Sequence, residues 1–256
     1  MSSPQGRFVW YELMTTDTAA AERFYREVVG WVAADAGMPD MSYTILSAGD
    51  APVAGLMAVP AEAAAAGAQP GWIGYVAVPD VDDYAGRVER AGGAVLRAPD
   101  DVPNMLRFAV VADPSGVPFV IFKGTGGSMP DVPLKALGHA HWHELYGGEV
   151  EPTFGFYSDL FGWTKDEAMD MGDGGVYQLV SMGRGEAEGA MMKGQEGGPS
   201  PRWNFYFRVG DIKSAIERIK EKGGQVMMGP YEVPSGDWIV QGMDPQGAAF
   251  SLVAPK

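Results

Sequence analysis

An internal repeat limits the possible folds of this chain more than any other feature. The segment FVWYELMTTDTAAAERFYREVVGW at residues 8–31 returns as AHWHELYGGEVEPTFGFYSDLFGW at residues 140–163. In the same order, WIGYVAVPDVDDYAGRVERAGGAV from residue 72 matches WNFYFRVGDIKSAIERIKEKGGQV from residue 203, and DPSGVPF from residue 113 matches DPQGAAF from residue 244. A repeat that spans both halves indicates that each half has the same fold.

The spacing of apolar residues predicts the same elements in both halves. Residues 9–14 alternate as a strand does, and residues 18–29 have helical spacing, with Thr16 or Asp17 as a plausible N-cap. Residues 81–91 form a second predicted helix, which a glycine pair ends, and the apolar segments around the two helices are predicted strands. Each half is therefore expected to contain two βαβββ modules.

The chain is expected to form two domains joined by a linker. Its 256 residues are enough for two domains that each bury a core. The segment GTGGSMPDVPLKALG at residues 124–138 has the glycine, serine and proline content typical of a linker. The predicted domains are residues 1–123 and 139–256.

Composition limits the expected partners and compartment. A formal net charge of -14 without a cluster of lysine and arginine disfavours nucleic acid and anionic membranes, so a small molecule is the expected partner of a monomer or homodimer. No basic segment followed by an apolar stretch opens the chain, and no apolar run approaches about 18 residues, so we expect a cytoplasmic protein. The absence of cysteine excludes disulfides and thiolate chemistry.

The repeated motifs resemble the vicinal oxygen chelate superfamily of glyoxalases, bleomycin-resistance proteins and extradiol dioxygenases. The resemblance rests on FYREVVGW and FYSDLFGW, on PDVDD and GDIKS, and on DPSGVPF and DPQGAAF, and it covers nearly the whole chain in two copies. The combination of W-x-E-L with DPQGAAFSL is most similar to the tandem two-domain glyoxalase-related branch. The resemblance implies an α+β fold with two glyoxalase-like domains, each a curled mixed sheet of two βαβββ modules that forms a cup.

The resemblance also implies where a metal would bind. Enzymes of this superfamily hold a divalent metal with a His or Gln on the first strand, a His or Gln on the strand before the second helix, and a Glu on the last strand. Carried onto this sequence, these positions are Trp10, Ile73 and Val120 in the first half, and Trp142, Asn204 and Ser251 in the second half. Because Trp, Ile and Val cannot ligate a metal, and Asn with Ser lacks a carboxylate, we expect no metal cofactor.

All three histidines lie in HAHWHEL at residues 139–145. This H-x-H spacing, which zinc enzymes use, places the imidazoles on one face of a strand. The repeat predicts that this face is opposite Trp142 and Glu144, so we expect the imidazoles to pack on the helix side or at an interface. The alternative is a Zn, Fe, Mn or Ni site formed by His141, His143 and Glu144, which requires a bulge or a register shift.

Two glutamates are predicted to face the cups, Glu12 in the first half and Glu144 in the second. Burial raises the pKa of a carboxyl group, which suits a general base or an anchor for a cation. The structural alternative is that each carboxylate accepts hydrogen bonds and holds the curl of the sheet. Aromatic and polar side chains would complete the cups. The predicted ligand-binding residues are Trp142, Asn204, Tyr206, Ser251, Met191, Trp10 and Tyr75.

These features favour a protein that binds a small aromatic or cationic molecule in an aromatic- and Glu-lined cup. It would sequester that molecule or transform it with Glu144 as the base, and the second cup is favoured because Asn204 and Ser251 add polar groups to it. One alternative is a metal-dependent glyoxalase-like lyase or a dioxygenase or hydroxylase that uses residues 139–143. Another is a non-catalytic assembly module. The residues leave open whether there is turnover; an enzyme of this family would be a lyase or an oxidoreductase.

Overall fold

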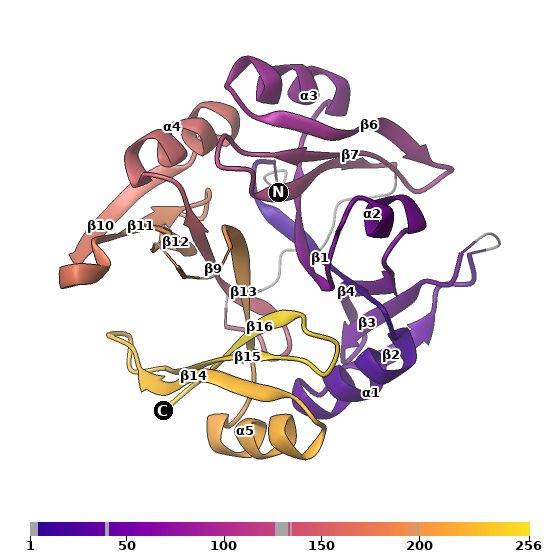
Figure 1. Cartoon of the computed structure of the whole chain (residues 1–256), viewed down its shortest axis with the longest axis vertical. Helices are drawn as coiled ribbons and strands as arrows, with labels where there is room; N and C mark the ends of the chain where they lie inside the picture. The colour runs from indigo at the N-terminus through magenta and orange to yellow at the C-terminus, as the bar shows by residue number, and fades with distance from the viewer. Residues whose placement is uncertain (1–4, 39–40, 126–132, 134, 196, 199) are drawn as a thin grey trace. The chain divides into compact units, whose positions relative to one another are not determined.

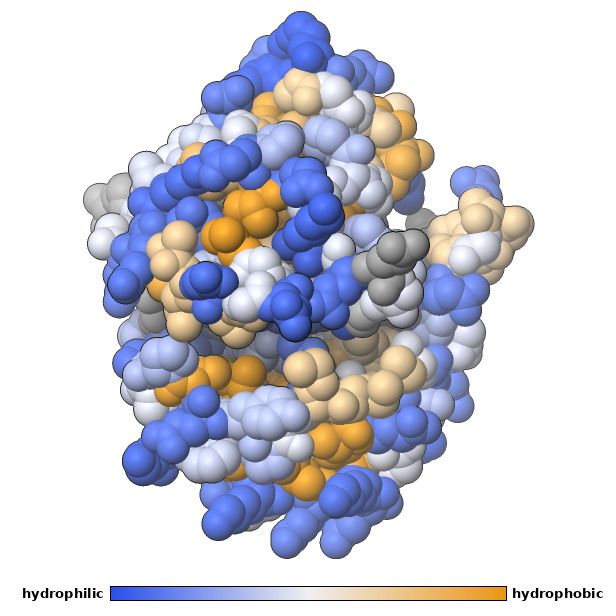
Figure 2. Space-filling model, turned by 60° about the vertical axis from the view of Figure 1, so that its left-hand side comes forward, coloured by the Kyte–Doolittle hydropathy of each residue, from blue (hydrophilic) through white to orange (hydrophobic). Residues whose placement is uncertain are grey.

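The computed structural model describes the chain except residues 1–4, 39–40, 126–132, 134, 196 and 199 (Figure 1). Most of the predicted linker therefore lies outside the described residues, and the domain boundaries at residues 123 and 139 stay a prediction. None of the described helices is long and apolar enough to cross a membrane. On the face drawn in Figure 2, hydrophobic residues form small patches among hydrophilic ones.

Four helices cover the strands, and aspartates start three of them. In each of these three helices, the aspartate side chain accepts a hydrogen bond from the backbone N–H three residues later, which satisfies an otherwise unpaired donor of the first helical turn. The aspartates are Asp17, Asp80 and Asp211. The N-cap of the first helix is thus Asp17. The helices are α1 (Thr18–Val28), α3 (Val81–Arg90), α4 (Val150–Phe161) and α5 (Ile212–Glu221), with the short α2 (Ala61–Ala65) and the 3-10 turn η1 (Gly172–Gly174).

The strands form two eight-stranded mixed sheets of the same topology, with the orders β2-β3-β4-β1-β5-β8-β7-β6 and β10-β11-β12-β9-β13-β16-β15-β14. This confirms the predicted α+β tandem repeat of βαβββ modules. The first sheet contains β1 (Phe8–Thr15), β2 (Val32–Asp35), β3 (Thr44–Ala48), β4 (Ala51–Ala58), β5 (Gly71–Ala77), β6 (Ala94–Val102), β7 (Leu106–Ala112) and β8 (Pro118–Gly124). The second contains β9 (Ala140–Gly147), β10 (Thr164–Asp170), β11 (Val176–Ser181), β12 (Gly189–Lys193), β13 (Arg202–Arg208), β14 (Gln225–Glu232), β15 (Trp238–Met243) and β16 (Ala249–Ala254).

The chain divides into two compact units, and each unit combines a module from each half. Unit 1 comprises the described residues of Met1–Val9, Ile73–Val132 and His143–Trp203. Unit 2 comprises those of Trp10–Trp72, Pro133–Trp142 and Asn204–Lys256. Within unit 1 α3 packs against α4, and within unit 2 α1 packs against α5 (Figure 1).

The repeated motifs join the two halves inside unit 2. The Tyr25 hydroxyl donates to Asp244 Oδ2 (3.1 Å) and accepts from Trp72 Nε1 (3.0 Å), which places the FY motif of one half on the DPQG turn of the other. Trp31 Nε1 donates to the Gly138 carbonyl (2.7 Å). Gly138 has a φ of +74°, and a Cβ there would lie 2.7 Å from the Ala48 Cβ, so this close approach requires glycine.

Unit 1 contains the same arrangement with the halves exchanged. The Tyr157 hydroxyl donates to Asp113 Oδ2 (3.2 Å) and accepts from Trp203 Nε1 (3.1 Å), while Trp163 Nε1 donates to the Gly6 carbonyl (2.6 Å). Burial raises the pKa of the Asp113 carboxyl, as it does for Asp244 in unit 2. The motifs that identify the repeat therefore hold the modules together within each unit.

Candidate functional site

The candidate site begins with the part of β13 that belongs to unit 2, residues 204–208, whose two faces differ in chemistry. Phe205 and Phe207 pack against Tyr11, with ring centroids 5.0 and 5.8 Å apart, and so belong to the core. Because side chains alternate along a strand, the intervening positions form the opposite face. The residues at those positions are Asn204, Tyr206 and Arg208, all of which are buried.

Two neighbouring strands extend this face with polar side chains. Tyr206 pairs in register with Ser251 on β16, and Ser251 pairs with Gln241 on β15. The Gln241 amide donates to the Tyr206 hydroxyl at 2.6 Å. Tyr206 and Ser251 are buried, whereas Gln241 is half-buried. The register thus brings together two of the predicted ligand-binding residues and adds Gln241, which sequence reasoning missed.

An ion pair lies at the end of the same face. Arg208 Nη2 donates to Asp237 Oδ1 (3.2 Å), and the two side chains are only 8% and 10% exposed. Asp237 Oδ2 accepts from Ser235 Oγ (3.2 Å) and lies 3.9 Å from His141 Nε2. Neither Arg208 nor Asp237 was predicted as a site residue. We refer to the following residues as the polar cluster: Asn204, Tyr206, Arg208, Asp237, Gln241 and Ser251.

The polar cluster has no polar counterpart in the first half, apart from one tyrosine. In the repeat, Tyr206 corresponds to Tyr75, and His141, next to the cluster, corresponds to Val9. Every other position of the cluster is apolar in the first half. The counterparts of Asn204, Arg208, Asp237, Gln241 and Ser251 are Ile73, Ala77, Leu106, Val110 and Val120. The sequence signal for Arg208, Asp237 and Gln241 is a polar residue in the second half where the first half has an apolar one. A position-by-position comparison of the two copies could have identified them.

Glu12 belongs to a separate hydrogen-bonded group in unit 2. The Tyr43 hydroxyl donates to Glu12 Oε2 (2.9 Å) and accepts from Trp10 Nε1 (3.1 Å). Burial raises the pKa of the Tyr43 phenol, and the nearby Glu12 carboxylate adds to this shift. Gly55 on β4 pairs with Glu12, and a Cβ at Gly55 would lie 1.8 Å from the Tyr43 hydroxyl oxygen. The glycine therefore provides the space in which the phenol reaches the carboxylate.

Glu144 has the equivalent partner in unit 1. The Tyr177 hydroxyl donates to Glu144 Oε1 at 2.8 Å, and Ala190 pairs with Glu144 as Gly55 does with Glu12. Both glutamates are buried. Sequence reasoning missed Tyr43 and Tyr177, although each opens a similar segment, YTILSAG and YQLVSMG. The carboxylate–phenol pair is thus a feature of both halves, in contrast to the polar cluster.

The three histidines have separate surroundings. Burial lowers the pKa of the His139 imidazole. His141 lies near Asp237 in unit 2. His143 belongs to unit 1, where its ring stacks on Phe8 with centroids 5.1 Å apart and its Nδ1 lies 3.0 Å from the Glu188 carbonyl oxygen. Within the part of the chain that the structure describes, no group of three or more His, Asp or Glu side chains could hold a metal ion.

The donor set at the family's metal positions does not fit a divalent ion. The indoles of Trp10 and Trp142 and the aliphatic chains of Ile73 and Val120 offer no lone pair of the kind that divalent ions bind. In unit 2, Asn204 and Ser251 supply neutral oxygens only.

The remaining predicted ligand-binding residues lie elsewhere. Tyr75 is buried in unit 1 and contacts Phe122, with ring centroids 5.8 Å apart. Met191 is 1% exposed and pairs with Leu145, so it shares the face of Leu145 and not that of Glu144. Trp142 is half-buried in unit 2.

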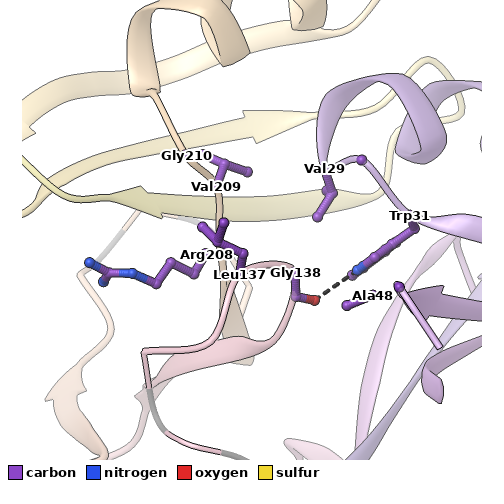
Figure 3. Close-up of a pocket in the computed structure, with 10 residues that line it drawn as sticks. Val29, Trp31, Ala48, Leu137, Gly138, Arg208, Val209 and Gly210 are labelled. Carbon is purple, nitrogen blue, oxygen red and sulfur yellow. Dashed lines mark hydrogen bonds between the residues drawn. The ribbon is translucent and has the colours of Figure 1, made fainter. Parts of the chain in front are cut away.

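Unit 2 also contains a shallow pocket of about 370 Å³ (Figure 3). It is lined largely by backbone and apolar groups, and the Trp31 indole N–H at its wall already binds Gly138. Figure 3 shows the Arg208 side chain extending away from Trp31, so this residue contributes its backbone. None of the predicted site residues lines the pocket. Its lining residues are Val29, Gly30, Trp31, Ala48, Gly49, Leu137, Gly138, Arg208, Val209 and Gly210.

Comparisons with known proteins agree over both halves of the chain. The family model of the Glyoxalase/Bleomycin resistance protein/Dioxygenase superfamily matches residues 7–121 and 137–252. The chain is 30% identical over 256 residues to "Putative glyoxylase CFP32" of Mycobacterium tuberculosis, with 98% of this chain and 95% of that protein covered. It is 32% identical over 263 residues to the anthracycline biosynthesis protein DnrV of Streptomyces peucetius, with 97% and 93% covered.

Two solved structures share the fold at low sequence identity. The Mn(II)-bound glyoxalase from Novosphingobium aromaticivorans aligns with a TM-score of 0.67 at 16% identity, over 99% of this chain and 83% of that chain. The 2,3-dioxygenase LapB from Pseudomonas sp. KL28 also aligns with a TM-score of 0.67, at 14% identity, over 97% and 91%.

Proposed function

Since the chain belongs to the glyoxalase/bleomycin resistance protein/dioxygenase superfamily, we propose that it binds a small planar aromatic molecule at the polar cluster. One observation carries this proposal: five of the six positions of the cluster are apolar in the first half. Burying polar side chains costs free energy, and the first half forms the same sheet without them. A function in the second half accounts for the difference.

The chemistry of the cluster suits a ring that bears oxygen substituents. Tyr206 supplies an aromatic ring, and the half-buried Gln241 binds its hydroxyl. The Asn204 amide and the Ser251 hydroxyl can each donate to a carbonyl oxygen or accept from a hydroxyl group. A relative named as an anthracycline biosynthesis protein supports this class of ligand, because anthracyclines contain planar rings with hydroxyl and carbonyl groups.

We assign the two carboxylate–phenol pairs to the support of the sheets. Glu12 with Tyr43 and Glu144 with Tyr177 occur in both halves, whereas the polar cluster occurs only in the second. A feature that is independent of the cluster is better explained by a structural need that both halves share. The role of Glu144 as a general base stays a prediction, which turnover measurements on Glu144→Gln would test.

The proposal is tested by giving the second half the residues of the first. The variant carries Asn204→Ile and Ser251→Val, and the probe is an anthracyclinone, the ring system of an anthracycline without its sugar. We expect the affinity to fall about tenfold or more in calorimetric titration, because two hydrogen bonds contribute roughly 1–2 kcal/mol.

The matched control is Glu12→Gln, which changes a buried polar group outside the cluster. It is expected to bind the probe as the unmodified chain does, and circular dichroism checks that both variants fold. Unchanged affinity in the Asn204→Ile, Ser251→Val variant would refute the proposed site.

A further inference from the structure

Arg208 and Asp237 form a buried ion pair that the fold itself does not require. In the first half Ala77 and Leu106 occupy the two equivalent positions. A buried ion pair is seldom more stabilising than apolar residues of similar size, because both charges lose their hydration. The pair is therefore better explained by recognition than by stability.

The hydrogen bonds of this pair leave donors on the guanidinium. Asp237 Oδ1 accepts from Arg208 Nη2, and Oδ2 accepts from Ser235 Oγ. Arg208 Nη1 is buried and has no acceptor among the residues that the structure describes. A buried charged donor without an acceptor is unfavourable, so an acceptor brought by a ligand would bind strongly.

The charges of the group favour an anion over a cation. Arg208 and Asp237 cancel each other, and His141, 3.9 Å from Asp237, adds positive charge whenever it is protonated. The group of Arg208, Asp237 and His141 carries no excess negative charge that would attract a cation, although the whole chain has a formal net charge of -14. An arginine with spare N–H donors matches the oxygens of a carboxylate.

The geometry points to Arg208 as the carboxylate-binding residue for a small aromatic acid. This inference rests on the proposed function and adds the acidic group to the ligand. Arg208 and Tyr206 lie on one face of β13, about 6.7 Å apart along the strand, so a ring near Tyr206 and a carboxylate at Arg208 need only a short link. Tyr206 would thus contact the ring of the ligand, and Arg208 would bind its carboxylate.

The test compares phenylacetate with its neutral isostere phenylacetamide, by ligand-observed NMR titration of the whole chain. The variant carries Arg208→Ala and Asp237→Leu, which reproduce the apolar pair of the first half and leave no buried charge unpaired. We expect the unmodified chain to prefer phenylacetate by roughly tenfold or more. The variant should lose this preference while it still binds phenylacetamide.

The outcomes separate the two proposals. Equal binding of both probes by the unmodified chain, unchanged in the variant, would overturn the role of Arg208 and leave the aromatic site intact. A preference for phenylacetate that persists in the folded variant would also overturn it. If the unmodified chain binds none of the three compounds, phenylacetate, phenylacetamide and the anthracyclinone, both proposals are overturned. Arg208→Lys, which keeps the charge but not the planar fork, should retain part of the preference.

Discussion

At the scale of single residues, the Tyr43 phenol reaches a buried carboxylate through the space beside a glycine. Gly55 pairs with Glu12, and the phenol of Tyr43 occupies the space that a side chain at position 55 would fill. The hydroxyl that donates to Glu12 also accepts from Trp10, so all three side chains depend on this space. In unit 1 Ala190 takes the equivalent position and the Tyr177 hydroxyl still reaches Glu144, so the need for glycine comes from the particular placement of Tyr43.

We therefore predict that Gly55→Ala destabilises the chain by about 2 kcal/mol, because the phenol must move and its bond to Glu12 is lost. Denaturant unfolding would measure the change. Gly71→Ala is the matched control, since the nearest heavy atom to its Cβ would be 4.0 Å away, and this variant should be close to neutral. Equal stability of the two variants would contradict the role given to Gly55.

At the scale of elements, a turn of one half binds a helix of the other within each unit. The DPQG turn places Asp244 at the Tyr25 hydroxyl, and its Oδ1 also accepts the backbone N–H groups of Gln246 and Ala248. Burial nevertheless raises the pKa of this carboxyl group above its ordinary value. Desolvation thus outweighs the hydrogen bonds, and the folded state favours the protonated form more than the unfolded state does.

This raised pKa predicts a definite pH dependence. Between the unfolded pKa, about 3.9, and the higher folded pKa, the folded chain binds more protons, so its free energy of unfolding falls as pH rises. Asp244→Asn removes the titration. The stability of the variant minus that of the unmodified chain should therefore increase as pH rises through this interval and level off above it. A difference that is constant from pH 3 to pH 7 would show that the folded state does not shift this pKa.

The same elements show what a sequence can reveal about a structure. The repeat and the apolar spacing predict the four long helices and the βαβββ modules, because these depend on local pattern and on comparison of two copies. The pairing of modules across the halves was left open, because it depends on contacts between distant segments. The partners of the glutamates were missed because Tyr43 is 31 residues from Glu12 and meets it only through the arrangement of the strands. Arg208 was missed because, read alone, it is one charged residue at a strand end.

At the scale of the whole molecule, a duplicated fold carries an unduplicated polar cluster. Both sheets have the same strand order, and each compact unit takes one module from each half. The motifs that both halves share hold the two modules of each unit together. The residues of the polar cluster lie on β13, β15 and β16 and, for Asp237, directly before β15. Our central proposal is that the shared motifs hold the fold and this unshared cluster binds the ligand.

A crystal structure of the chain with a bound anthracyclinone tests this claim most directly. We expect electron density for the ring system beside Tyr206 and Asn204 in the second half, and none beside Trp10 and Glu12. Density beside Trp10 and Glu12, with the polar cluster unchanged, would contradict it.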